Sequence, residues 1–425
     1  MKYFRENKLS FFAILLISLS LFGYRFYYSP YGNGRSMRVL DWDAFGYYQY
    51  LPATFIYHDV KNEAFLTEID KKYHVIGEGA HLYQLHVFED SSVTARYLGG
   101  VAILETPFFF FAHVYAGFFD YPQDGFSLPY QWSIAVGVLF YIIIALFLLQ
   151  WVLRRFYNDE ITAMVLTLIV LASNALQYFS IDGAMSHSWL FFLYSLLLYF
   201  TIKWHNEPKK VWASLIGLTI GLLILGRPTE IISVFIPLLW ATHNKDEAQK
   251  KWQFIKSHKS HLFFALGFGL LGILPQLIYW QITTGLPIYA IGSKWDFLNP
   301  WFRVLFGLEE GWFVYTPVTI LMITGFLFMK NKPFRKVLLW FGLINIWIII
   351  SWHDWRYGAT FSVRALVQSY PVYALTLGLF VQWVYRKGFK IAFLIFAAIL
   401  LLINLLNIYK YNLGILDYSA LLALQ

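Results

Sequence analysis

Long apolar stretches separated by short polar connections dominate the chain. A helix needs roughly 20 apolar residues to cross the hydrocarbon core of a membrane. Eleven stretches approach this length, namely 9–25, 130–153, 161–180, 188–203, 211–226, 230–242, 262–282, 312–329, 337–351, 366–384 and 391–409. The pattern predicts an all-α, polytopic membrane protein with about eleven transmembrane helices in one domain over residues 1–425.

Two apolar segments, one of them the first of these eleven stretches, need separate interpretation. The segment 101–119 is interrupted by Glu105 and Pro107, and we expect it to form an interfacial or re-entrant helix on the outer side. The first stretch follows a basic N-terminus and resembles a signal peptide, but the residues after it, 24–27, are Tyr-Arg-Phe-Tyr. Because a cleavage site needs small residues, the sequence predicts a retained first membrane helix.

The basic residues predict the orientation, because short cytoplasmic loops of membrane proteins carry an excess of lysine and arginine. With the N-terminus inside, the inner loops hold 20 of the 33 Lys and Arg residues but only 6 of the 25 Asp and Glu residues. The inner side then carries +14, the outer side carries −6, and the C-terminus lies outside. The basic excess is therefore a topology signal and not a nucleic-acid patch.

The overall composition agrees with this class. The chain is 58% hydrophobic and only 14% charged, whereas roughly a quarter of the residues of a soluble protein are charged. This excludes an ordinary soluble or a disordered protein. The chain has no cysteine, so disulfides and thiolate-metal sites are excluded as well.

The chemistry-bearing residues lie on the predicted outer side, where 19 of the 25 acidic residues fall. They occur in a long first loop, 26–129, in a short connection, 180–187, and in the loops 283–311 and 352–365, with Gly226-Arg227-Pro228 at a helix end. Carboxylates act as general bases or bind divalent cations, and arginines bind phosphate. Such a site suits a donor in which a sugar is attached to a lipid phosphate.

These residues resemble the GT-C superfamily of integral-membrane glycosyltransferases, especially the branch of protein O-mannosyltransferases and lipid A aminoarabinose transferases. Three features carry the resemblance: the acidic motif Asp41-Trp42-Asp43-Ala44-Phe45-Gly46-Tyr47-Tyr48 after the first helix, the long first outer loop, and the motifs Gly226-Arg227-Pro228, Gly311 to Pro317 and Trp352 to Arg364 followed by Pro371. The likeness is architectural over nearly the whole chain.

The resemblance implies inverting transfer of a sugar from a polyprenyl-phosphate carrier at the outer face. It places the catalytic acid at Asp43, with Asp41 second, although Ala44 stands where many members carry another acid. It implies a donor phosphate held by Arg364 first, then by Arg356 and Arg227. Further site contacts on the same side are His187, Asp182 and Tyr47.

Each of these residues also has a structural interpretation. Asp41 and Asp43 can be solvated loop acids, or Asp43 can cap a helix that begins near Phe45. His187 can be a satisfied interfacial histidine, and Arg227 can extend to lipid headgroups. Arg356 and Arg364 can form ion pairs with Asp354 or Glu310. A Mg²⁺ or Mn²⁺ ion at Asp41 and Asp43 stays open, and no cofactor is required.

The leading functional hypothesis is therefore a polyprenyl-phosphate-sugar-dependent hexosyl- or pentosyltransferase. Its acceptor is a glycolipid, a polysaccharide or a protein, and its expected location is a bacterial-type cytoplasmic membrane with the active site on the periplasmic face. Two alternatives are a flippase or transporter for lipid-linked saccharides and a non-catalytic assembly subunit. The nearly charge-free span interiors disfavour a transporter. A large separation of Asp43 and Arg364 would favour the assembly subunit.

Overall fold

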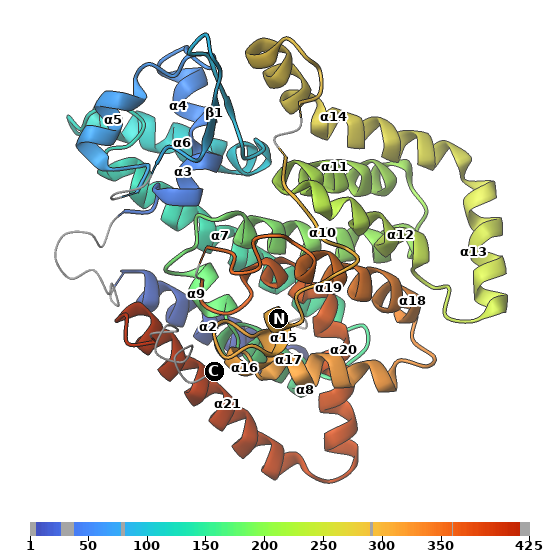
Figure 1. Ribbon diagram of the computed structural model, residues 1–425. Helices are drawn as coiled ribbons and strands as arrows, with labels where there is room; N and C mark the ends of the chain where they lie inside the picture. Colours follow the sequence, from blue (N-terminus) through green and yellow to red (C-terminus); the bar gives the residue numbers. More distant parts are fainter. Residues whose placement is uncertain (1–5, 27–37, 78–80, 290–291, 359, 417–425) are drawn as a thin grey trace.

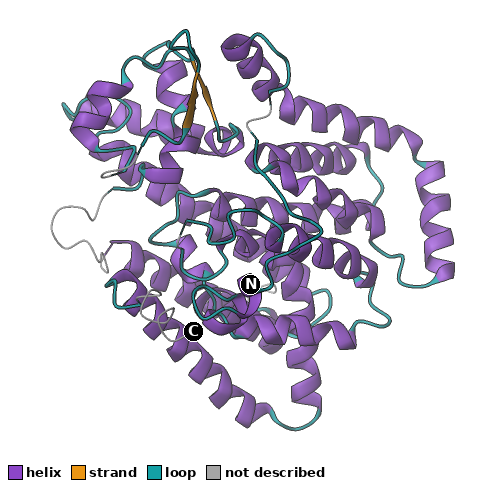
Figure 2. Ribbon diagram, in the orientation of Figure 1, coloured by secondary structure: helices purple, strands orange, loops and turns teal. Residues whose placement is uncertain are grey.

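The computed structural model describes residues 6–26, 38–77, 81–289, 292–358 and 360–416, and these are predominantly helical (Figures 1 and 2). The first half contains α2 (Lys8–Phe26), α3 (Trp42–Tyr48), α4 (Tyr50–Phe55), α5 (Leu66–Tyr73), β1 (Leu85–Val87), β2 (Val93–Ala95), α6 (Gly100–Phe118), α7 (Leu128–Leu153), α8 (Asp159–Leu171), α9 (Ala175–Phe179), α10 (Ser186–Asn206) and α11 (Lys210–Gly226).

The second half is built mainly from shorter and broken helices. It contains η1 (Pro228–Val234), α12 (Phe235–Leu239), α13 (Lys245–Ser257), α14 (Lys259–Thr284), α15 (Arg303–Phe306), α16 (Trp312–Tyr315), α17 (Val318–Thr324), η2 (Gly325–Phe328), α18 (Arg335–Val337), η3 (Leu338–Gly342), α19 (Leu343–Ile350), η4 (Arg364–Ser369), α20 (Tyr370–Arg386) and α21 (Lys390–Asn412).

All eleven predicted spans fall on helical segments, but they differ in length and continuity. Among the described residues, five helices are long and apolar enough to cross a membrane: α2, α6, α7, α14 and α21. Several other predicted spans are broken, such as 161–180, which is divided into α8 and α9. The fold supports a membrane protein, and the number of spans stays a prediction. The all-α prediction did not include the two short strands.

The loops predicted on one side of the membrane meet at one end of the molecule. At the end that we call inner, three contacts join different loops, namely Ser10 Oγ to Asp159 Oδ1 at 2.5 Å, Lys390 Nζ to Glu160 Oε1 at 2.5 Å, and Ala241 N to the Pro333 carbonyl at 2.8 Å. At the opposite, outer end the corresponding contacts are Arg25 Nη1 to the Ile181 carbonyl at 3.2 Å, Asn412 Nδ2 to Gln177 Oε1 at 2.9 Å, and Asp296 N to the Ser351 carbonyl at 2.7 Å. These contacts bring loops together at two ends of the molecule, and the side of the membrane on which each end lies stays a prediction.

Helices α11 and α14 lie side by side because small residues let their backbones approach closely (Figure 1). A Cβ atom added to Gly217 would lie 1.9 Å from the Ala265 carbonyl oxygen, and one added to Gly221 would lie 2.4 Å from that of Gly269. Small residues four positions apart on both helices are typical of helix pairs in membranes. The opposite face of α14 exposes large apolar side chains such as Phe263 and Leu266, as a lipid-facing helix does.

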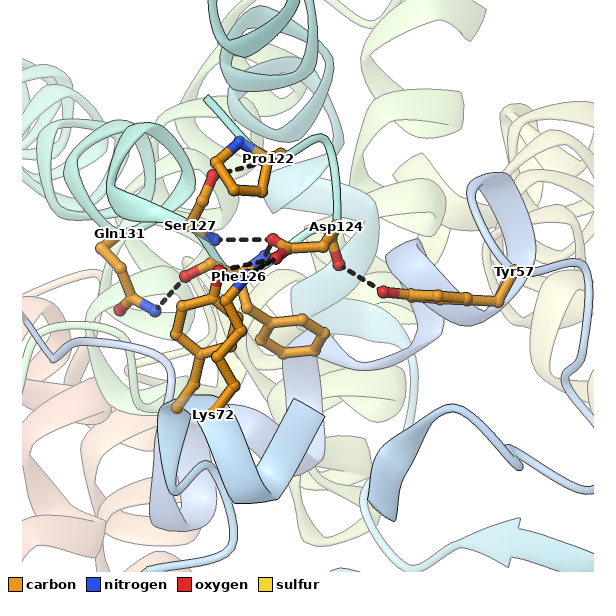
Figure 3. A network of polar contacts seen from close by, with 8 residues as sticks. Tyr57, Lys72, Pro122, Asp124, Phe126, Ser127 and Gln131 are labelled. Atoms are coloured by element: carbon orange, nitrogen blue, oxygen red, sulfur yellow. Dashed lines mark hydrogen bonds and ion pairs between the residues drawn. The ribbon is translucent and has the colours of Figure 1, made fainter. Parts of the chain in front are cut away.

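The segment from Val39 to Ser127 forms a compact cap at the outer end (Figures 1 and 2), which we call the outer segment. It contains α3 to α6 and the antiparallel pair β1–β2, in which Leu85 pairs with Ala95. A network around Asp124 closes it (Figure 3): Oδ1 accepts hydrogen bonds from the backbone N–H groups of Phe126 (3.0 Å) and Ser127 (2.9 Å). Oδ2 accepts from Tyr73 Oη at 2.6 Å and pairs with Lys72 Nζ at 3.0 Å.

Helix α6 corresponds to the segment predicted as interfacial, and both of its ends contact outer parts of the molecule. At its start, Gly99 N donates to Gln276 Oε1 at 2.8 Å, and Gly100 packs against the end of α11. Toward its C-terminal end, His113 Nδ1 lies 2.6 Å from Tyr130 Oη, near the start of α7. Its length and composition alone also allow it to cross a membrane, and the interfacial placement stays a prediction.

Candidate active site

Asp43 lies at the centre of a polar cluster that joins the outer segment to the loop 352–365. Its Oδ2 atom is 2.8 Å from Arg364 Nη2, and both side chains are largely buried. Its Oδ1 atom accepts hydrogen bonds from Tyr83 Oη at 2.8 Å and Tyr97 Oη at 2.7 Å. Charge-assisted hydrogen bonds of this kind are about twice as strong as neutral ones, so the carboxylate is held from both sides.

The surroundings of Asp43 keep its carboxylate ionised. Burial is the largest influence and by itself raises the pKa, but the Arg364 charge and the hydrogen bonds from Tyr97 and Tyr83 together outweigh it. The pKa of Asp43 is therefore lowered. Burial and the Asp43 charge raise the pKa of Tyr83 and of Tyr97, so both phenols stay protonated and donate.

The start of α3 orients Asp43. Trp42 adopts a left-handed backbone conformation with φ of +49°, which is strained for a bulky residue. Its N–H donates to the Val75 carbonyl at 3.0 Å, and its carbonyl accepts from Gln84 Nε2 at 3.2 Å. Because α3 begins at Trp42, Asp43 lies within its first turn, and the prediction that Asp43 caps a helix starting near Phe45 is wrong. Asp41 occupies the capping position, but its side chain makes no capping hydrogen bond.

Arg364 is the first residue of η4, and a buried polar network holds that turn. Gln368 accepts from His187 Nδ1 at 2.6 Å through Oε1, and its Nε2 donates to Glu230 Oε1 at 2.9 Å. Glu230 also accepts a hydrogen bond from Tyr194. His187 is thus a buried histidine in the network that holds the turn of Arg364, and its role as a site contact stays a prediction.

Arg227 and Tyr47 lie near the pair without joining it. The Arg227 charge acts on Asp43 and on Tyr47, and Arg227 forms no ion pair with any residue that the structure describes. Tyr47 is buried on α3, with its ring centroid 4.7 Å from that of Tyr97. Arg227 therefore brings an uncommitted cation to the same cluster.

Arg356 lies apart from Asp43, against the third outer loop. Its Nε atom is 3.5 Å from Glu309 Oε2, its guanidinium packs on Trp355, and its side chain is 53% exposed. The neighbouring Glu310 is mostly buried, and burial, against the Arg364 charge, raises its pKa to about 8. This shift favours the protonated form of Glu310 near neutral pH, and that form can donate a hydrogen bond.

Asp41 and Asp182 form a second acidic pair beside Asp43. Burial, followed by repulsion from Asp182, raises the pKa of Asp41 to about 6. Asp182 Oδ2 accepts from Gln177 Nε2 at 2.9 Å, and burial raises its pKa against the charges of Arg364 and Arg25. Asp41 is thus the less favourable of the two motif acids for staying ionised.

The cluster does not form a ready cation site. Within the described ranges, no group of three or more His, Asp or Glu side chains is placed to hold a metal ion. Both oxygens of Asp43 already have partners, and one of these partners is a cation. The residues as arranged do not fit a divalent ion at Asp41 and Asp43.

Sequence reasoning missed Tyr83 and Tyr97, the two hydroxyl donors to Asp43. The outer segment contains many tyrosines, and none of them stands out by spacing or motif. The network of Gln368 and Glu230 was missed for the same reason. Glu310 was recognised as a loop acid, but only its burial marks it as a protonated group.

Neither protein-family models nor curated protein sequences match this chain. Solved structures do resemble it. The apo crystal structure of the Archaeoglobus fulgidus oligosaccharyltransferase matches with a TM-score of 0.52 at 13% identity, over 96% of this chain and 55% of that one. The same protein, AglB, in complex with an inhibitory peptide and a dolichol-phosphate matches with a TM-score of 0.51 at 12% identity, over 98% and 56%.

A third structure of that oligosaccharyltransferase, tethered to an acceptor peptide containing the NVT sequon, has a TM-score of 0.53 at 11% identity and covers 99% of this chain. This chain spans about 56% of the length of that neighbour. At 11–13% identity the likeness concerns the fold alone. The GT-C superfamily stays a prediction from the resemblance, and nothing in these neighbours supports the mannosyl- or aminoarabinosyltransferase branch.

Proposed function

We propose that this protein is a membrane glycosyltransferase that transfers a sugar from a polyprenyl-phosphate-linked donor to an acceptor hydroxyl, with inversion, at the outer end. The observation that carries the proposal is the buried ion pair of Asp43 and Arg364, 2.8 Å apart. A base and a phosphate-binding cation side by side are the two groups that such a transfer needs. The membrane fold and the apolar surfaces of α14 and α21 are consistent with a lipid-linked donor.

The proposed reaction follows from this geometry. The acceptor hydroxyl attacks the anomeric carbon while Asp43 takes its proton, and the bond between that carbon and the phosphate oxygen breaks. The electron pair leaves with the polyprenyl phosphate, and Arg364 and Arg227 stabilise its negative charge. Glu310, in its protonated form, donates a hydrogen bond to the same phosphate.

Donor binding also prepares the base. In the free protein, the Arg364 charge is the main influence that lowers the pKa of Asp43. A bound donor phosphate competes for the same guanidinium, so the pKa of Asp43 rises and its carboxylate becomes a stronger base. Without the donor, Arg364 would thus keep Asp43 ionised. With the donor bound, Asp43 would be a stronger base and could take the proton of the acceptor hydroxyl.

For the acceptor and the sugar, the proposal names only chemical classes. A glycolipid, a growing polysaccharide or a protein side chain can each supply a hydroxyl, and a peptide acceptor agrees with the complexes known for the structural neighbour. The hexosyl or pentosyl branch, the bacterial-type cytoplasmic membrane and the periplasmic face stay predictions. A panel of polyprenyl-phosphate sugars offered to the reconstituted protein addresses the donor directly.

The decisive test is Asp43→Asn in proteoliposomes loaded with the donor panel. We expect the rate of sugar transfer to fall at least about 100-fold, because a general base contributes that much or more. Asp90→Asn is the matched control, since Asp90 is an exposed acid of the same outer segment. Equal transfer by both variants and the wild type would refute the assignment of Asp43.

A further inference from the structure

A cavity at the inner end is separate from the Asp43 cluster. It has a volume of about 510 Å³ and is lined by residues that include Arg155, His205, Trp240, Lys250, Lys251 and Phe254. His187 and His205 lie in the first and last turns of α10. Because a helix rises about 1.5 Å per residue, the two ends of α10 are roughly 27 Å apart. The cavity therefore cannot belong to the proposed active site.

The charges around the cavity are mainly positive. Arg155, Lys250 and Lys251 line it together with one carboxylate, Glu247. Glu247 pairs with Lys250 at 2.9 Å. Arg155 is exposed and packs its guanidinium 3.9 Å from the Trp151 ring centroid. Two cations, Arg155 and Lys251, thus form no ion pair with any residue in the described part of the chain.

Lys251 is the unusual member of this group, because its side chain is buried at 4% exposure. Its Nζ atom donates to the Pro237 carbonyl at 2.9 Å and to Nε2 of His205. His205 Nδ1 lies 2.7 Å from the Thr201 carbonyl, so Nδ1 carries the proton and Nε2 accepts. An ammonium has three N–H donors, and these contacts use two, which leaves the third for a ligand.

A buried cation without a counter-ion is costly, and a bound anion removes that cost. Burial lowers the pKa of Lys251 to about 7. A negative group in the cavity would raise this pKa again and keep the lysine charged. The cavity thus holds a buried lysine that lacks a counter-ion, and a bound anion would supply that counter-ion.

The position of the cavity indicates where that anion comes from. Its walls come from α13, from the C-terminal end of α10, from the loops after α7 and α12, and from Pro333. The distribution of Lys and Arg places these segments on the cytoplasmic side. Helix α13 carries four lysines, at 245, 250, 251 and 256, and exposes Trp252. A basic amphipathic helix with an exposed tryptophan is typical of the headgroup region of a membrane.

We propose that this cavity binds the phosphate of an anionic phospholipid headgroup, with Lys251 and Arg155 as its main ligands and Trp240 and Phe254 against the glycerol. The size is appropriate, since cavities of about 300–1,000 Å³ hold small ligands. Basic pockets between helices on the cytoplasmic side are known to bind such headgroups. The bound lipid would tie α13 to the helix ends that surround it.

Lipid binding to the purified full-length protein tests this proposal. Native mass spectrometry and thermal melting in detergent would compare dioleoyl phosphatidylglycerol with dioleoyl phosphatidylcholine. We expect phosphatidylglycerol to bind about tenfold more tightly and to raise the Tm. Lys251→Gln should remove most of this preference, and Lys256→Gln should retain it, because Lys256 lies on the same helix but is exposed and outside the cavity.

A second variant covers the case in which Lys251→Gln does not fold. Arg155→Gln changes an exposed residue and should weaken phosphatidylglycerol binding several-fold. Equal binding of the two lipids, or an unchanged preference in both variants, would overturn the proposal. If millimolar inorganic phosphate displaces phosphatidylglycerol and itself raises the Tm, the phosphate site is upheld, but its ligand is a soluble phosphate and not a lipid.

Discussion

Asp43 and Asp124 are two carboxylates of the same outer segment, and they are held in opposite ways. Asp124 accepts two backbone N–H groups of its own turn and contacts Tyr73 and Lys72 nearby (Figure 3). Within the described part of the chain, the partners of the Asp43 carboxylate are side chains: two tyrosines of the outer segment and an arginine from the other end of the chain.

This difference in partners indicates a structural role for Asp124 and a chemical role for Asp43. The backbone donors cannot leave Asp124 without opening the turn, so this carboxylate is suited to stabilising the fold. The partners of Asp43 are side chains that can move to a ligand while the backbone stays in place. A carboxylate whose main partner is a phosphate-binding cation suits a group that must change its proton affinity during a reaction.

Among the substitutions that test this comparison, removal of the Arg364 charge should change the rate of sugar transfer most. We expect Arg364→Gln to lower sugar transfer about 100-fold, because it removes the charge that stabilises the leaving phosphate. It should also raise the pKa of Asp43, since burial then acts with less opposition. The residual activity should therefore be lost at a higher pH than in the wild type as the pH falls. An acid limb at the same pH in both proteins would contradict the coupling of the two residues.

The opposite result is expected at Asp124. Asp124→Asn retains an oxygen for the backbone N–H groups but loses the charge that faces Lys72 and Tyr73. We expect it to lower the free energy of unfolding by about 1–3 kcal/mol, seen as a lower Tm in detergent. The rate of transfer per folded molecule should stay within about threefold of the wild type. A loss of transfer comparable to that of Asp43→Asn would end the distinction between the two carboxylates.

Asp41 gives the smallest and most pH-dependent effect. Its raised pKa of about 6 means that ionisation destabilises the folded state, and this loss develops as the pH rises from about 4 to 6. We expect Asp41→Asn to raise the free energy of unfolding at pH 7.5 by up to about 2 kcal/mol, which a higher Tm would show. At pH 4 the substitution should have little effect. A gain that is equal at both values would show that the charge of Asp41 is not the cause.

The sequence pointed to Asp43 as a candidate, but it did not describe the contacts of this residue. The acidic motif and its position after the first helix singled it out, and the loop 352–365 singled out Arg364. The same reasoning ranked Arg356 second, yet the fold turns it to Glu309, and Arg227 lies closer to the cluster. Nothing in the local sequence distinguishes these arginines, because the distinction depends on which loops meet.

Local prediction also failed where the backbone is unusual. The start of α3 was expected near Phe45, but the left-handed conformation of Trp42 moves it to residue 42. A tryptophan has no intrinsic preference for that conformation. Contacts with Val75 and Gln84 impose it, and these contacts exist only in the folded outer segment.

By itself the sequence indicated a helical membrane protein, and it predicted the grouping of the loops and the side that carries the acids. These properties follow from apolar length and from the placement of Lys and Arg, which are sums over many residues and tolerate local errors. Only the tertiary structure decided that Asp43 meets Arg364, Tyr83 and Tyr97, and that Lys251 is buried in a basic cavity. Such contacts join residues far apart in the chain, and their energies depend on distances of a few ångströms that no local pattern encodes.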